Sequence, residues 1–162
     1  MLLLDEIQAA LDSIGFARAL ELTIRHFQTD SGSLHLLASD GLLHLRASFG
    51  IPERVLAIVN TIPVGKGMAG LAVERRQPVT ACNLQTDTSG DVRPGARATG
   101  MEGAIVVPVL EGDKAIGALG IANRSERTFT TEETELLMEV GRRIAAAAAG
   151  SGIAAQIPPP RR

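Results

Sequence analysis

The stretch from Ala104 to Asn123 constrains the fold more than any other part of the chain. It holds two apolar runs, residues 104–110 and 115–122, joined by the turn sequence Glu111-Gly112-Asp113-Lys114. Neither run leaves a solvated face, so each predicts a β-strand that is buried on both sides. An antiparallel hairpin of this kind must lie in the middle of a sheet, with helices or a ligand pocket covering each face.

Residues 2–28 predict two helical segments with apolar stripes that point in different directions. The second stripe is rotated by about 200° from the first at about 100° per residue, and Gly15 loosens the junction between them. The stripes consist of Leu3, Leu4, Ile7, Ala10, Leu11 and Ile14 in the first segment and of Phe16, Leu20, Ile24 and Phe27 in the second. The two segments therefore need different packing partners.

The last helix is predicted to begin at a capping box, in which Thr130 caps the helix and Glu133 reaches back to it. Its apolar arc extends over roughly 220°, about twice what one sheet face requires, so another helix should cover the surplus. The helix should end near Ala149. We therefore expect one domain over residues 1–150, with the segment 2–14 serving in dimerisation, and a flexible tail or linker over residues 151–162.

A second hairpin is predicted across Asp40-Gly41, a strong turn signal between residues 34–39 and 42–49. If Ser39 lies opposite Leu42, one face is core and the other is mixed. The core face then holds Leu34, Leu36, Ala38, Leu43, Leu45 and Ala47, and the mixed face holds His35, Leu37, His44, Arg46 and Ser48. Solvated histidines suit this mixed face better than metal ligands, so we expect no metal site, and we keep His44 as a candidate ligand contact.

Composition excludes several classes of function. The net charge is −2, from 16 basic and 18 acidic residues, without a basic cluster of the kind that tracks phosphates. We expect neither a nucleic-acid nor a membrane partner. Cys82 is the only cysteine in the sequence, so an internal disulfide is impossible, and a cytoplasmic location is the simplest interpretation.

Candidate ligand contacts fall in two places. Gly65, Gly67 and Gly70 match the spacing G-x-G-x-x-G, but the helix that follows is too short for a dinucleotide fold. The glycines either permit a tight turn or leave the N–H groups of Met68, Ala69 and Gly70 free to hold an anion. The long loop 83–100 is the second place. Its candidates are Asp87, Arg93 and Arg97, with Met101 after it.

Three segments together resemble a GAF domain. They are IPVGKGMAGLAVERRQPVTACNLQTD, GAIVVPVLEGDKAIGALGIANR, and Phe129-Thr130 with Glu132-Glu133 before a helix. The resemblance covers roughly residues 12–149. It implies an α+β fold with a central, mostly antiparallel sheet of five or six strands. The terminal helices would lie on one face, and the short helices and the long loop would cover a ligand pocket on the other.

The resemblance also implies a function. GAF domains are sensory modules that usually pair through their terminal helices, so we expect a signalling domain that binds a small molecule, without catalysis, as a homodimer coupled to an output domain, a kinase or a transcription factor. The ligand and any cofactor stay unknown. One alternative is a degenerate GAF domain that serves only as a scaffold. Another is a free methionine-(R)-sulfoxide reductase, but members of that branch use two cysteines and this chain has Cys82 alone.

Overall fold

A six-stranded antiparallel sheet forms the centre of the computed structural model, which describes residues 2–13 and 15–151. The strand order is β3-β2-β1-β6-β5-β4, and every pair of neighbours is antiparallel. The strands are β1 (Ser31–Leu37), β2 (Leu42–Phe49), β3 (Thr61–Pro63), β4 (Val79–Ala81), β5 (Ala104–Glu111) and β6 (Lys114–Ala122). The hairpin β5–β6 lies inside the sheet, as the two-sided apolar pattern predicts.

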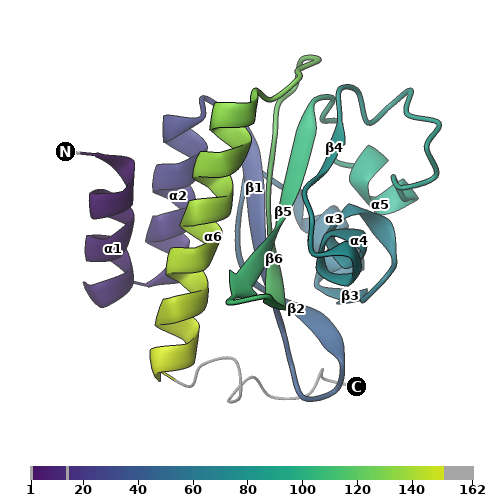
Figure 1. Ribbon diagram of the computed structural model, residues 1–162. Helices are drawn as coiled ribbons and strands as arrows, with labels where there is room; N and C mark the ends of the chain where they lie inside the picture. The colour runs from purple at the N-terminus through teal and green to yellow at the C-terminus, as the bar shows by residue number, and fades with distance from the viewer. Residues whose placement is uncertain (1, 14, 152–162) are drawn as a thin grey trace.

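Helices cover both faces of this sheet (Figure 1). They are α1 (Leu3–Ser13), α2 (Phe16–His26), α3 (Glu53–Val59), α4 (Gly67–Arg75), α5 (Pro94–Arg97) and α6 (Thr131–Ser151). The terminal helices lie on one side, and α3, α4 and α5 lie on the other. The predicted α+β architecture is confirmed. The expected tail lies, from residue 152 on, outside the described residues.

The main core lies between the sheet and the terminal helices. Large side chains from three strands point toward these helices, and Leu34, Val107 and Leu119 are fully buried there. Leu34 pairs with Leu119, and Leu119 pairs with Val107, so one row of the sheet supplies all three. Burying each such side chain contributes about 1.5–3 kcal/mol.

Helix α1 packs outside α2 and α6, as a third layer of the same chain (Figure 1). Leu3, Ile7 and Ala10 are buried in the same core cluster as the inner residues of α6. Gln8 also accepts a hydrogen bond from Arg143 of α6 at 3.4 Å. The surplus apolar arc of α6 therefore meets a helix from its own chain, and the apolar stripe of α1 has an intramolecular partner.

The predicted capping box begins α6. The backbone N–H of Thr130 donates to Glu133 Oε1 at 2.9 Å, and the N–H of Glu133 donates to Thr130 Oγ1 at 3.1 Å. Arg127 donates to the other carboxylate oxygen of Glu133 at 2.6 Å. These hydrogen bonds lower the pKa of Glu133 below its ordinary value, the bond from Thr130 having the largest effect. They fix the position at which the helix leaves the sheet.

The predicted register of the first hairpin is wrong by one residue. Ala38 and Leu42 pair at its end, and the loop contains Ser39, Asp40 and Gly41. Asp40 Oδ1 accepts the N–H of Leu42 at 3.0 Å, and Gly41 takes a positive φ of 80°. This three-residue loop therefore replaces the two-residue turn that Asp-Gly predicts.

The shift moves several side chains to the opposite face of β2, because strand side chains alternate. His44 lies opposite Leu36, on the face of the terminal helices, and Leu43 lies opposite Leu37, on the face of α4. The register recovers where Arg46 is inserted as a bulge, so Leu34 pairs with Ala47 as predicted. His35 and His44 therefore do not share a face.

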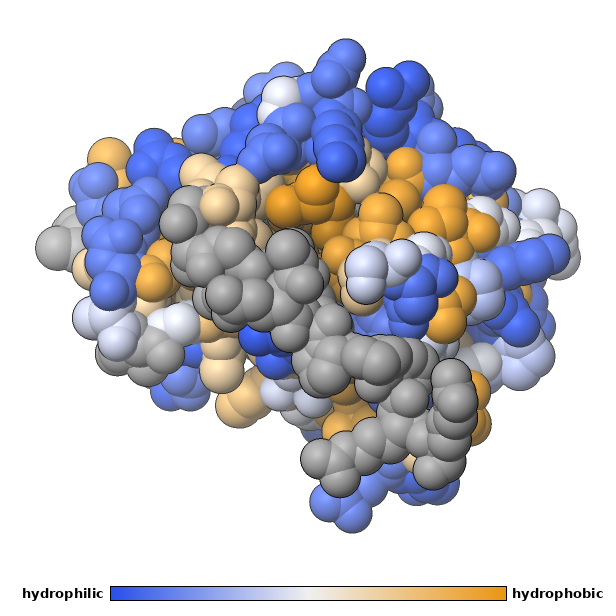
Figure 2. Space-filling model, turned by 90° about the horizontal axis from the view of Figure 1, so that it is seen from below, coloured by the Kyte–Doolittle hydropathy of each residue, from blue (hydrophilic) through white to orange (hydrophobic). Residues whose placement is uncertain are grey.

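The surface of the described chain is mixed in character. Seen from below in Figure 2, apolar side chains come to the surface in the middle of the molecule, with polar and charged residues around them. No helix in residues 2–13 or 15–151 has the length and apolar character needed to span a lipid bilayer.

Candidate functional site

A cavity of about 450 Å³ lies on the face of the sheet away from the terminal helices. Its floor is made by the rows of the sheet in which side chains are small. Ser33 pairs with Gly120, which pairs with Val106, and the next row joins Ser31, Ala122 and Ala104. On the other face, which packs against the terminal helices, the same strands carry large side chains. The cavity therefore exists because β6 alternates large residues with small ones.

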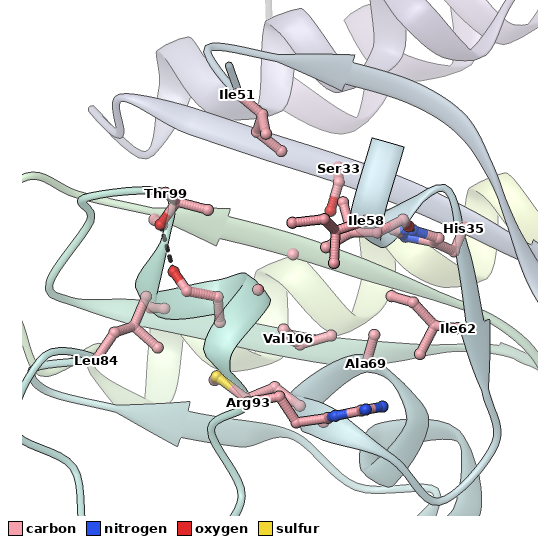
Figure 3. A pocket seen from close by; sticks show the side chains of 18 of the residues that line it. Ser33, His35, Ile51, Ile58, Ile62, Ala69, Leu84, Arg93, Thr99 and Val106 are labelled. Carbon is pink, nitrogen blue, oxygen red and sulfur yellow. Dashed lines mark hydrogen bonds between the residues drawn. The ribbon is translucent and has the colours of Figure 1, made fainter. Parts of the chain in front are cut away.

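Three short helices and the segments beside them form the cover. Figure 3 shows Ile51 and Ile58 in the upper part of the view and Arg93, Ala69 and Leu84 in the lower part. The cover contributes Ile51, Ile58, Val59, Thr61–Pro63, Lys66–Ala69, Leu84, Arg93–Ala96 and Thr99. A mostly apolar cavity of this size with few polar groups is typical of small-molecule sites.

The charged side chains of the cover lie near the start of α4. Lys66 and Arg93 both line the cavity, and neither side chain has a hydrogen-bond or ion-pair partner within residues 2–13 and 15–151. The backbone N–H groups of Gly67, Met68 and Ala69 likewise have no acceptor in the part of the chain that the structure describes. Two cations and a helix N-terminus at one corner favour a negatively charged group there.

The glycines at this corner have separate roles. Gly67 has φ 66°, and a Cβ on it would lie 3.2 Å from Arg93 Cδ, so glycine lets the arginine side chain lie across the helix start. A Cβ on Gly70 would lie 2.3 Å from the carbonyl oxygen of Pro63, so glycine is needed for packing against β3. The N–H of Gly70 donates to Lys66 O. Of the three N–H groups expected to be free, that of Gly70 is therefore occupied.

The remaining predicted contacts lie outside the cavity lining. Asp87 accepts hydrogen bonds from Ser89, and its carbonyl oxygen accepts one from Arg97 at 2.8 Å, so both side chains hold the loop together. Met101 is buried in a cluster with Met68. His44 bonds Asp40 Oδ2 at 2.8 Å, on the opposite face of the sheet. The structure thus brings Gly67, Met68, Ala69 and Arg93 together at the cavity and places the other candidates elsewhere.

His35 lines the cavity, although sequence reasoning treated it as a surface residue. Only 2% of it is exposed, and its Nε2 lies 2.7 Å from the carbonyl oxygen of Val59 at the end of α3. Burial lowers the pKa of His35 below its ordinary value of 6.5, partly opposed by the bond to Val59 and aided by the nearby His44. The ring is therefore neutral at pH 7.

We expect the domain to lose stability as the pH falls below about 6.5, the ordinary pKa that His35 has in the unfolded chain. Because the folded pKa is lower, the unfolded chain binds the proton more readily, so acid favours unfolding. The slope for one group is at most about 1.4 kcal/mol per pH unit. Urea unfolding between about pH 7.5 and 5.5 measures it, and His35→Gln should flatten the dependence. An equal slope in that variant would contradict the assignment.

Sequence reasoning missed the floor of the cavity, although a signal was present. Ala118, Gly120 and Ala122 alternate with Leu119 and Ile121, which places all the small residues on one face. That pattern indicates a strand that packs into the core on the face of its large side chains and borders an open space on the face of its small ones.

Cys82 is exposed at the end of β4 and does not line the cavity. Within the described residues, no group of three or more His, Cys, Asp or Glu side chains is placed to hold a metal ion.

Comparison with known proteins agrees with the fold described above. The family model of the GAF domain matches residues 9–148. The GAF domain of an Acinetobacter phosphoenolpyruvate-protein phosphotransferase is 18% identical, covers 96% of each chain and superposes with a TM-score of 0.79. No match was found among curated proteins.

Enzymes are also among the similar structures. The free methionine-R-sulfoxide reductase from Neisseria meningitidis is 18% identical, with coverage of 94% of this chain and 89% of that one and a TM-score of 0.77. A type II enzyme of the same name from Thermoplasma acidophilum is 18% identical, with coverage of 88% and 96% and a TM-score of 0.69. The expectation that the chain is not an enzyme is corrected by this finding, because the same fold carries catalysts.

Proposed function

Because the chain belongs to the GAF domain family, we propose that it is a regulatory domain that binds a small organic anion in this cavity. The cavity itself carries the proposal. It combines about 450 Å³ of mostly apolar space with one cationic corner, at the start of α4. The apolar walls suit a carbon skeleton, and the corner suits a carboxylate or a phosphate.

Arg93 is the side chain best placed to hold the anionic group. It belongs to the loop that leads into α5, and its stem lies over Gly67. A guanidinium without a protein partner can donate two parallel hydrogen bonds to a carboxylate or phosphate. Binding would therefore tie the loop to the start of α4 and order the cover.

Ligand binding can change the packing of the terminal helices in two ways, through the strands that form the floor of the cavity and through Arg127. Residues of β6 face the cavity and the helix core in turn, so repacking of the floor moves Leu119 and Ile121. Arg127 donates to Phe27 O at 2.6 Å and to Glu133, and its N–H donates to Cys82 O at 3.1 Å. It thus connects the end of β4 with α2 and with the start of α6.

The proposal includes a homodimer formed through the terminal helices, as the family implies. Part of the apolar surface of α1 and α6 is used within the chain, and Leu4, Leu11, Leu136 and Met138 stay partly exposed for a second copy. Light scattering at about 100 μM measures the assembly, and a particle of 17.0 kDa would contradict it. The domain would act in the cytoplasm on an output domain or a partner such as a kinase or transcription factor.

We expect Arg93→Ala to weaken binding of small aromatic anions by about tenfold to a hundredfold, the range for hydrogen bonds to a charged group. Calorimetric titration with phenylacetate and phenyl phosphate measures the change. Arg54→Ala is the matched control, because Arg54 carries the same charge on α3, is exposed and lies outside the lining.

Two results would contradict the proposal. Equal weakening by Arg93→Ala and Arg54→Ala would show a general effect of charge and not a contact. Failure of both probes and of related carboxylates to bind at about 10 mM would remove the anion site altogether.

A further inference from the structure

The imidazole ring of His35 has a defined tautomer. Its Nε2 lies 2.7 Å from the carbonyl oxygen of Val59. A carbonyl oxygen only accepts hydrogen bonds, so Nε2 must carry the hydrogen. In a neutral ring the other nitrogen, Nδ1, then has a lone pair and no hydrogen.

Nδ1 of His35 opens into the cavity. No hydrogen bond to it is found within the described ranges of the chain. In the same residues, no side-chain nitrogen or oxygen is both sealed from solvent and without a partner. Since His35 is 98% covered and lines the cavity, the space that reaches Nδ1 is the cavity.

This atom differs in kind from the other polar side-chain groups of the lining. Lys66 and Arg93 only donate hydrogen bonds, and the hydroxyls of Ser31, Ser33, Thr61 and Thr99 both donate and accept. Nδ1 accepts and cannot donate. It therefore distinguishes a ligand with an N–H or O–H group from one without, which the hydroxyls cannot do.

We propose that Nδ1 of His35 determines ligand specificity by accepting a hydrogen bond from an N–H or O–H group on the ligand. This inference rests on the proposed function. The ligand class is then a small organic anion with a hydrogen-bond donor on a part of the molecule away from its charge. The charge lies at the start of α4, on the cover, and the donor lies over β1, on the floor. The ring also holds the end of α3 through Val59, so the ligand and this helix share one side chain.

The tautomer is tested on the protein without ligand. Long-range ¹H–¹⁵N correlation spectra of the full chain at pH 7 should show His35 with a protonated Nε2 and an unprotonated Nδ1. A protonated Nδ1, in either the other tautomer or the imidazolium, would overturn the proposal, because no acceptor would face the cavity.

Specificity is tested with matched pairs of probes of increasing length. They are 4-hydroxybenzoate, 4-hydroxyphenylacetate and 3-(4-hydroxyphenyl)propionate, each against its 4-methoxy ether, which has no donor. The best hydroxy probe should bind about tenfold more tightly than its ether. The ratio should fall to about one in His35→Phe and recover partly in His35→Gln, whose amide can donate to Val59 and accept from the ligand.

The outcomes separate this inference from the proposed function. Carboxylates that bind through Arg93 with equal affinity for each hydroxy and methoxy pair would overturn the inference alone. A ratio that persists in His35→Phe would also overturn it, because the preference would then arise from size. Absence of binding by every probe would overturn the anion site and the inference together. Thermal unfolding of each variant without ligand confirms that it is folded before its ratio is used.

Discussion

Replacing Gly120 by leucine is expected to abolish ligand binding while the domain stays folded. Gly120 forms the centre of the cavity floor, between Ser33 and Val106. An isobutyl side chain there would occupy the space that the ligand needs, so affinity should fall more than about a hundredfold.

The backbone tolerates this substitution, which makes the result interpretable. Gly120 has no positive φ, and the nearest atom to a Cβ would be a methyl group of Val106 at 3.2 Å. Adjusting that side chain should change the free energy of unfolding by no more than about 1–2 kcal/mol. Thr80→Leu is the control, since Thr80 is exposed on β4 and lies outside the lining. Unchanged affinity in a folded Gly120→Leu variant would place the ligand elsewhere.

Gly117→Ala should cause a large loss of stability, of about 3 kcal/mol. Gly117 lies on β6 between two neighbouring strands, beside a bulge at Ile116. A Cβ on it would lie 2.4 Å from the carbonyl oxygen of His35 and 2.8 Å from a methyl group of Leu36. The backbone of His35 cannot move aside as a flexible side chain can. Strands β1 and β6 would therefore have to separate.

Gly120→Ala is the matched control for this prediction, because the closest contact of the same substitution on the same strand is a methyl group of Val106 at 3.2 Å, and its other contacts are at ordinary distances. In thermal unfolding, Gly117→Ala should lower the midpoint by about 6–12 °C. Gly120→Ala should lower it by much less. Equal midpoints for the two variants would show that β1 and β6 do not approach as closely as the structure has them.

The sequence predicts the architecture wherever one pattern has one physical solution. A hairpin without a polar face, residues 104–122, can only lie inside a sheet. The sequence Thr130 to Glu133 satisfies its own hydrogen bonds as a helix cap, so the start of α6 is determined locally. Gly15, with φ 113°, separates two helices whose stripes diverge.

Features that depend on packing between distant segments could not be predicted in this way. Asp40-Gly41 is compatible with a two-residue and a three-residue loop, and the choice decides which face His44 takes. His35 and His44 look equivalent in the sequence. One lies at the cavity and the other on the helix side only because β1 and β2 pair with a register one residue from the expected one.

The candidate site could be predicted in part. The start of α4 and Arg93 carry chemical signals of their own, a glycine-rich helix start and a cation in a long loop. The floor has no such signal in any single residue, because an empty space is made by small side chains on three strands. Asp87 and Arg97 are charged like ligand contacts, but their partners lie within the loop.

The most direct test of the account is a titration of ¹⁵N-labelled protein with phenylacetate and the hydroxy probes, followed by ¹H–¹⁵N spectra of the wild type and Gly120→Leu. We predict shift changes at Ser33, Gly67–Ala69 and Arg93 in the wild type, and none at these positions in the variant. The same changes in both proteins, or changes confined to residues outside the cavity, would contradict an anion site between β1, β6 and α4.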